Sequence, residues 1–190
     1  MPDFLKQSYQ LRFESYCLSK KFIPKEDYPE LLEIDKYDKL SHHIFYIENS
    51  IVVGTLRMIP FSTDFGYPAE QYFPFLYDII SEEGYPIEST VEVSRFCISK
   101  RCSNKFLATV QLFKELWETS KEDGITHWIA CFEKTLYRLL KRQGFEFNLL
   151  SNESVDYFGE VYLYGIAIND IEEEVRGNSP DLCKFFEDAS

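Results

Sequence analysis

The sequence lacks an excess of positive charge. Its 190 residues include 20 lysines and arginines against 32 aspartates and glutamates, which gives a formal net charge of −12. Nucleic acids and anionic membranes attract a basic protein surface, so this balance argues against both as main partners. No apolar run is long enough to span a bilayer, and the first residues have no apolar signal core. We therefore predict a cytoplasmic protein with no integral membrane segment and no nucleic-acid partner.

Cysteine pairs and metal-ligand spacings are also missing. The five cysteines are an odd number and lie scattered along the chain, which favours reduced thiols over a disulfide framework. His42, His43 and His127 form no ligand spacing with any cysteine, so we predict that no metal is bound.

Apolar and aromatic residues are plentiful. Hydrophobic residues make up 45% of the chain and aromatic residues 17%, a composition that excludes a disordered protein. The length is sufficient for one sizeable core, or at most for two small ones. We predict a single domain over residues 1–170, followed by an acidic tail at 171–190 that includes Glu172–Glu174.

The periodicity of apolar residues predicts an alternation of strands and helices. The expected elements are a helix at 4–20, a proline-containing segment at 22–40, a hairpin of strands at 41–47 and 51–59, a short helix near 73–81, a strand from residue 90, helices at 105–123 and 133–143, and strands at 125–131, 145–150 and 161–168. This order predicts the α/β class, with a mixed, mostly antiparallel central sheet flanked by helices.

Three details of these elements can be checked directly. Gly54 inside a strand indicates a bulge or a close approach of another chain segment. Ser103 or Asn104 can cap the helix at 105–123, and Gly124 can end it. The buried stripe expected on this helix consists of Phe106, Val110, Phe113 and Trp117.

The strand that begins at Thr90 carries charge among strand-forming residues. Glu92, Ser94 and Arg95 lie between Val91, Val93, Phe96 and Ile98, so polar and apolar residues do not separate onto two faces. A buried charge is costly unless it is paired. Two interpretations follow: a structural ion pair in a half-exposed strand, or a polar site within the sheet.

The order of elements resembles the GNAT acyltransferase superfamily, and several motifs resemble its acyl-homoserine-lactone autoinducer synthases. These motifs are Glu33–Asp38, Gly54–Arg57, Glu92–Phe96 and the spacing of Arg12, Tyr16 and Phe22, where Phe22 replaces the usual tryptophan.

A sister group is more similar still, the N-acyl amino acid synthases found with PEP-CTERM/exosortase systems. The similarity extends over about residues 9–168. It rests on Tyr16–Leu18, Glu26–Pro29, the Glu33–Asp38 run, Ser41 with His43, Gly124–Trp128 and Val155–Gly159.

This resemblance implies an N-acyltransferase that moves a long-chain acyl group from a carrier thioester to the amine of an amino acid. The implied catalytic residues are Glu92, Ser94 and Arg95. Glu92 is the expected base, because the amine must be neutral to attack. Backbone N–H groups from Arg95–Ile98 would stabilise the oxyanion. Direct transfer is the simplest mechanism, and an acyl-enzyme on Cys97 is the alternative.

The implied substrate-binding residues are Asp35, Asp38 and Arg57. Arg57 or Arg95 can bind the substrate carboxylate. The two aspartates would pair with these arginines and so order the segment at 22–40 as a cover over the substrate. Alternatively, they are ordinary loop carboxylates.

The donor site departs from the usual GNAT pattern. Ordinary members hold coenzyme A with a glycine-rich loop at a helix start, whereas residues 100–105 contain no glycine. This favours acyl carrier protein over coenzyme A as the acyl donor. The co-substrate is then the phosphopantetheine thioester of the carrier, with acyl-CoA as the alternative, and no cofactor is permanently bound. The residues assigned to carrier and pantetheine binding are Phe96, Cys97, Ile98, Arg101, Asn104 and Lys105. Lys100 would join Arg101 and Lys105 in a basic patch. A second cluster, made up of Arg138, Lys141 and Arg142, either extends this patch or consists of solvated helix ends.

Two alternative functions stay open. One is an autoinducer synthase that uses S-adenosylmethionine. The other is a non-catalytic sensor of acyl carriers, against which the retention of Glu92 and Arg95 argues.

Overall fold

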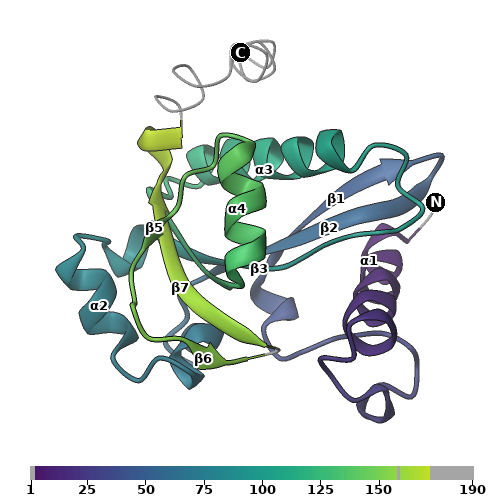
Figure 1. The fold of residues 1–190 in the computed structure, drawn as a ribbon, viewed down its shortest axis with the longest axis horizontal. Helices are drawn as coiled ribbons and strands as arrows, with labels where there is room; N and C mark the ends of the chain where they lie inside the picture. Colours follow the sequence, from purple (N-terminus) through teal and green to yellow (C-terminus); the bar gives the residue numbers. More distant parts are fainter. Residues whose placement is uncertain (1–2, 158, 172–190) are drawn as a thin grey trace. The chain divides into compact units, whose positions relative to one another are not determined.

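The structure is a computed structural model that describes residues 3–157 and 159–171 (Figure 1). Except for Ile171, the predicted acidic tail lies outside the described residues. The chain forms two compact units, one from the residues up to Pro60 with Val93–Leu116, the other from Phe61–Glu92 and the residues from Trp117 onward. The single domain over residues 1–170 stays a prediction.

The first unit begins with helix α1 (Phe4–Phe13), which continues as π-helical turns over Glu14–Ser19. The side chain of Asp3 caps α1 by accepting a hydrogen bond of 3.0 Å from the backbone N–H of Lys6. The helix predicted at 4–20 is therefore confirmed, with a change of helical type after Phe13. Two 3₁₀ turns, Lys25–Asp27 and Asp38–Leu40, interrupt the segment that follows.

Strands β1 (His42–Glu48) and β2 (Ile51–Pro60) form the predicted antiparallel hairpin. Asn49 and Ser50 have φ values of 51° and 64°, as a tight hairpin turn requires. Both expectations for Gly54 are confirmed. The strand register shifts after its partner Tyr46, and a Cβ atom on Gly54 would lie 3.1 Å from both Tyr46 and Leu112.

Strand β3 (Thr90–Ile98) and helix α3 (Lys105–Glu122) each begin in one unit and end in the other. The side chain of Asn104 accepts a hydrogen bond of 3.0 Å from the backbone N–H of Leu107, so Asn104 is the N-cap of α3. Val110 and Phe113 are buried as predicted and Trp117 is half-buried, but Phe106 is 55% exposed. Its assignment to the buried stripe was wrong, because it lies in the first turn, ahead of the buried face that begins at Ala108.

The second unit contains helix α2 (Leu76–Glu82), the start of β3, strand β4 (His127–Phe132) and helix α4 (Lys134–Arg142). It ends with strands β5 (Asn148–Leu149), β6 (Val155–Asp156) and β7 (Glu160–Ala167). Its core includes Tyr67, Phe73, Leu76, Ile80, Ile129 and Leu163. The predicted strand at 145–150 is shorter than expected, and β6 was not predicted.

The strands pair in the order β1-β2-β3-β4-β7-β5, with β6 also paired to β7. β3 and β4 are parallel and pair over Thr90–Glu92, whereas β1 with β2 and β7 with β4, β5 and β6 are antiparallel. The predicted fold class, a mixed and mostly antiparallel sheet with helices, is confirmed. In the described part of the chain, every helix is too short or too polar to cross a bilayer.

Candidate functional site

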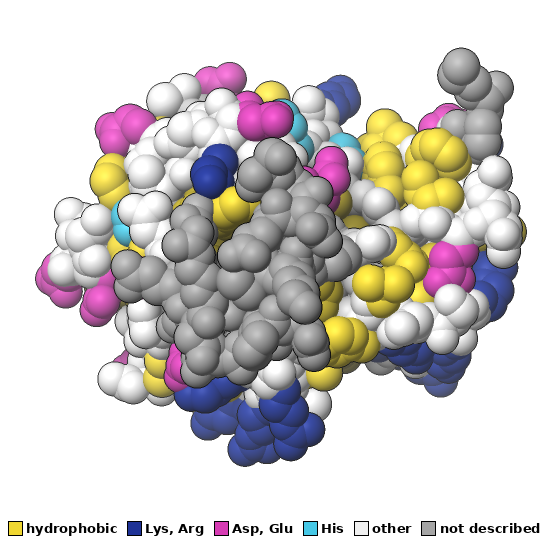
Figure 2. All heavy atoms as spheres, turned by 90° about the horizontal axis from the view of Figure 1, so that it is seen from above, with side chains coloured by type: hydrophobic (Ala, Val, Ile, Leu, Met, Phe, Trp, Pro, Cys, Tyr) yellow, Lys and Arg dark blue, Asp and Glu magenta, His cyan; other side chains and the backbone are white. Residues whose placement is uncertain are grey.

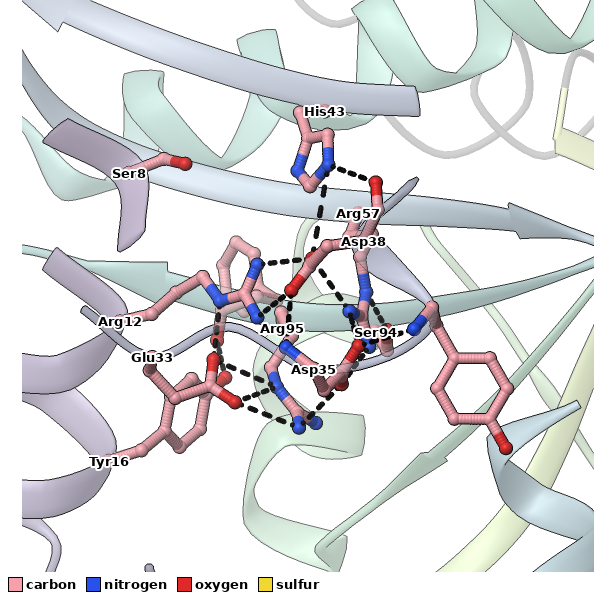
Figure 3. A network of polar contacts seen from close by, with 12 residues as sticks. Ser8, Arg12, Tyr16, Glu33, Asp35, Asp38, His43, Arg57, Ser94 and Arg95 are labelled. Carbon is pink, nitrogen blue, oxygen red and sulfur yellow. Dashed lines mark hydrogen bonds and ion pairs between the residues drawn. The ribbon is translucent and has the colours of Figure 1, made fainter. Parts of the chain in front are cut away.

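Six charged side chains converge inside the first unit (Figure 3). We call this group the buried ion network. It contains three arginines and three carboxylates, so its formal charge is zero: Arg12 from α1, Glu33 and Asp35 from the connecting segment, Asp38 from a 3₁₀ turn, Arg57 from β2 and Arg95 from β3.

Asp38 links two of the arginines. Its Oδ1 atom lies 2.7 Å from Nη1 of Arg12 and 2.7 Å from Nη1 of Arg57, and its Oδ2 atom lies 3.0 Å from Nη2 of Arg12. The Nε atom of Arg12 is also 2.5 Å from a carboxylate oxygen of Glu33. Arg12 is therefore held by two carboxylates, which offset the cost of burying its charge.

Asp35 links Arg57 to Arg95. Arg57 binds both carboxylate oxygens of Asp35, at 2.6 and 2.9 Å, and its Nε atom donates to the hydroxyl of Ser94 at 3.1 Å. Arg95 lies 3.1 Å from Asp35 and 3.0 Å from Glu33. The two aspartates thus pair with the arginines as the sequence indicated, while their role in substrate binding stays a prediction.

The backbone of the connecting segment is fixed by the same carboxylates. The N–H of Asp35 donates to Oδ2 of Asp38 at 2.7 Å, and the N–H of Tyr37 donates to Oδ1 of Asp35 at 2.9 Å. Nε2 of His43 lies 3.0 Å from the carbonyl oxygen of Asp38. The long proline-containing segment is therefore ordered by the network that it helps to form.

The arginines keep the aspartates ionised. Burial alone would raise the pKa of Asp38, but the hydrogen bonds and charges of Arg12 and Arg57 outweigh it and lower the pKa to about 2. Asp35 also has a lowered pKa, because Arg57 and Arg95 outweigh the opposing effect of burial. Asp35 and Asp38 consequently stay negatively charged throughout the neutral pH range.

One edge of the network reaches solvent. The side chains of Arg12, Glu33, Asp38 and Arg57 are at most 2% exposed, whereas Arg95 is 10% and Asp35 is 21% exposed. A guanidinium and a carboxylate are therefore presented side by side, 3.1 Å apart, at the accessible edge.

Arg95 has an unusual backbone conformation. Its φ angle is 55°, a left-handed value that a side chain in a strand rarely adopts. The hydroxyl of Tyr16 donates to the carbonyl oxygen of the next residue, Phe96, at 2.9 Å, and the Tyr16 ring lies 5.8 Å from the guanidinium carbon of Arg95. Such strain persists where surrounding contacts impose it, and it is concentrated at functional sites.

Arg12 and Glu33 were not among the predicted site residues, although both belonged to the motifs. A sequence signal for Arg12 existed: it lies three residues after Tyr9 and four before Tyr16, on the apolar side of a helix. An arginine at such a position requires buried carboxylates as partners.

Glu92, the expected base, lies in the second unit and is 2% exposed. The backbone N–H of Ala69 donates to its Oε2 atom at 2.8 Å. Burial, followed by the charge of Glu92, raises the pKa of the nearby thiol of Cys131. Glu92 is therefore a carboxyl group held inside an apolar core by a backbone donor, and its catalytic role stays a prediction.

Among the residues assigned to pantetheine, Cys97 is buried, and burial raises the pKa of its thiol to about 12. Phe96 packs edge-on against Phe113, with ring centroids 5.7 Å apart. Ile98 is partly buried against the small apolar cluster of Val53, Cys102 and Ala108.

Among the residues assigned to carrier docking, Arg101 and Lys105 are exposed. Arg101 pairs with Glu14 at 3.1 Å. Lys and Arg side chains gather in groups on the face shown in Figure 2, although the protein is acidic overall. Arg138, Lys141 and Arg142 are exposed on α4, where Lys141 is paired with Glu146. Within the described residues, no three His, Cys, Asp or Glu side chains are grouped to hold a metal ion.

The sequence matches the family described as an acetyltransferase (GNAT) domain over residues 11–112, which is more than half of the chain. The protein therefore belongs to the GNAT acyltransferases. The match includes every member of the buried ion network. No curated protein matches the chain significantly.

Three solved structures that this chain resembles in fold are acyl-homoserine lactone or N-acyl amino acid synthases. The CoA-dependent acyl-homoserine lactone synthase BjaI, solved with SAM and isopentyl-CoA, gives a TM-score of 0.73 at 21% identity, over 95% of this chain and 84% of that one. The AHL synthase LasI gives 0.70 at 19% identity, over 92% and 88%. FeeM, an N-acyl amino acid synthase from uncultured soil microbes, gives 0.59 at 14% identity, over 75% and 84%.

Proposed function

We propose that this protein is an N-acyltransferase that moves a long-chain acyl group from acyl carrier protein to the amine of an amino acid. The observation that carries the proposal is the accessible edge of the buried ion network, where Arg95 and Asp35 lie side by side. In this proposal the protein works in the cytoplasm, and its products are N-acyl amino acids, as in the exosortase-associated group that its motifs resemble.

The substrate-binding role is assigned to the two partly exposed members of the network. A free amino acid carries a carboxylate and an ammonium group a few ångströms apart. Arg95 offers a guanidinium for the carboxylate, and the neighbouring Asp35 offers a negative charge for the ammonium. The buried Arg57 donates hydrogen bonds to Asp35, Asp38 and Ser94. These bonds hold Asp35 and strand β3 in position.

Glu92 is the proposed general base. It precedes Arg95 by three residues on β3, so the chain itself limits their backbone separation to about 10 Å. The carboxylate would take one proton from the ammonium, directly or through a water molecule, and leave a neutral amine. Its fixed hydrogen bond from Ala69 restricts its orientation.

The proposed transfer is direct. The neutral amine attacks the thioester carbon, the C–S bond breaks, and the nitrogen loses a second proton as the amide forms. The leaving pantetheine thiolate takes up this second proton, and the first proton passes from Glu92 to solvent. An acyl-enzyme on Cys97 is disfavoured, because a buried thiol with a pKa of about 12 is not a thiolate at neutral pH.

The proposed partner is an acyl carrier protein, whose acidic helix would dock near Arg101 and Lys105. Both side chains are exposed, Arg101 in the turn before α3 and Lys105 at its first residue, and the protein is acidic overall. Opposite charges on two surfaces accelerate their association and orient them.

The experiment that tests the function is mass spectrometry of lipid extracts from a host that expresses the chain. Hosts that express the Glu92→Gln variant, or carry an empty vector, are the controls. We expect new N-acyl amino acids only with the unaltered chain, and their masses identify both the amino acid and the acyl chain.

Two other results would replace the proposal. Acyl-homoserine lactones in the extract would establish the autoinducer-synthase alternative, which shares the fold of the compared structures. No new product, together with binding of loaded acyl carrier protein by the purified chain, would establish the sensor alternative.

A further inference from the structure

The carboxylate of Glu48, at the end of β1, occupies the start of helix α3. Its oxygens accept hydrogen bonds from the backbone N–H of Ser103 at 3.2 and 3.3 Å and from the Ser103 hydroxyl at 2.7 Å. The thiol of Cys102 lies 3.6 Å from the same carboxylate. The hydrogen bonds from Ser103 lower the pKa of Glu48, so the carboxylate is charged at neutral pH.

Other backbone donors before and within the first turn of α3 are also engaged inside the protein. The N–H of Arg101 donates to the Ser99 hydroxyl at 3.2 Å, and the N–H of Cys102 donates to the Ser99 carbonyl at 3.2 Å. The Asn104 side chain accepts a hydrogen bond of 3.0 Å from the N–H of Leu107. Of these donors, the N–H of Leu107 belongs to the first helical turn, whose N–H groups a helix start normally offers to a phosphate, and the N–H groups of Arg101 and Cys102 belong to the turn before it.

The segment that carries these donors is anchored. Cys102 is 8% exposed and packs with Val53 and Ala108 in a small apolar cluster. The N–H of Ser99 donates to the carbonyl oxygen of Val53 at 2.7 Å. With the backbone fixed to β2 and no glycine between residues 100 and 105, the donors cannot be turned toward a ligand without breaking these contacts.

We propose that Glu48 is a specificity-determining residue that acts as an internal anion and disfavours donors with a nucleoside diphosphate. Coenzyme A would bring a diphosphate and a further phosphate to the helix start. There the carboxylate of Glu48 already accepts hydrogen bonds from the N–H and the hydroxyl of Ser103. A carrier protein presents the same pantetheine arm on a single phosphodiester. This inference depends on the proposed function in one respect: the acyl donor is a pantetheine thioester.

The test measures the binding of two probes, coenzyme A and pantetheine, by isothermal titration calorimetry at low salt. Glu48→Gln removes the charge but keeps an acceptor for Ser103, and Glu48→Ala also frees the Ser103 donors. Glu115→Gln is the matched control, because Glu115 is an exposed acid on the same helix, three turns from its start. Circular dichroism verifies that each variant is folded, and Glu48→Gln carries the test if Glu48→Ala is not.

We expect the dissociation constant of coenzyme A to fall at least about fivefold in Glu48→Gln, the effect of one unit charge at contact distance in water. The fall should be larger in Glu48→Ala and should shrink at high salt. Pantetheine binding should stay unchanged, and Glu115→Gln should behave like the unaltered chain.

Three results would overturn the inference: coenzyme A affinity unchanged in both Glu48 variants, equal changes for coenzyme A and pantetheine, or no coenzyme A binding by any variant. None of these results depends on acyl transfer. A failure of the proposed function would instead appear in the lipid extracts, with the binding results intact.

Discussion

Replacing Asp38 with asparagine removes one negative charge from the buried ion network while keeping the shape of the side chain. Asp38 is the carboxylate shared by Arg12 and Arg57. Its loss leaves three arginines against two carboxylates, and the network has a net positive charge in a site whose central members are at most 2% exposed.

The expected destabilisation is large. Removing one partner of a buried ion pair costs about 3–5 kcal/mol, because the other charge stays buried without compensation. The pKa of Asp38 gives an independent lower figure. A shift from 3.8 to about 2 corresponds to about 2 kcal/mol of stabilisation by the ionised form. With a urea dependence of about 2–3 kcal/mol per molar, the unfolding midpoint should fall by about 1–2 M.

The assay is urea unfolding followed by far-ultraviolet circular dichroism at neutral pH. Asp27→Asn is the control, because it removes the same charge from an exposed position in the same unit. An exposed site of this kind should change the stability by less than about 0.5 kcal/mol. If Asp38→Asn moved the midpoint no further than the control does, the account of the network as a coupled buried group would be wrong.

The pH dependence provides a second check on the same pair of proteins. Because the pKa of Asp38 is lowered on folding, its contribution is fully present above about pH 4 and is lost as pH falls toward about 2. The stability difference between the unaltered chain and Asp38→Asn should therefore be constant near neutral pH and shrink in acid. A difference that grows on acidification would contradict the sign of this linkage.

Three further predictions concern the chemistry. Glu92→Gln should lower turnover by about 10²–10⁴-fold, the usual contribution of a general base, and should leave carrier binding intact; unchanged turnover in a purified assay would remove Glu92 from this role. Reversing the charges of Arg101 and Lys105 should weaken carrier binding more at low salt than at high salt in a titration series, and a salt-independent effect would count against this docking surface. Cys97→Ala should keep turnover within about tenfold of the unaltered chain, because packing and not nucleophilic chemistry is lost; abolished turnover in a variant that folds normally would favour an acyl-enzyme.

Local patterns were sufficient for most of the fold. Strand alternation and turn residues located the hairpin of β1 and β2, and helical periodicity with caps at Asn104 and Gly124 located α3. Phe106 was misplaced, because a periodic stripe shows which face of a helix is apolar but not at which residue along the helix burial begins. Strand β6 was missed because two residues are too few to carry a period.

The charged motifs were visible in the sequence, but their partners were not. Glu33, Asp35 and Asp38 are close together along the chain, yet the arginines that neutralise them come from α1, β2 and β3. Which carboxylate pairs with which arginine depends on how those elements pack, since an ion pair of this kind is set by distances between segments far apart in the chain.

The sequence by itself determined the α/β class, the family and the identity of the charged residues, because periodicity, caps and motifs are local properties of the chain. Only the tertiary structure decided that Asp35 and Arg95 form the accessible edge of the network, that Arg95 adopts a left-handed conformation, and that Glu48 occupies the start of α3. Each of these depends on burial and on contacts between segments 55 or more residues apart, such as Glu48 with Ser103 and Arg95 with Asp35.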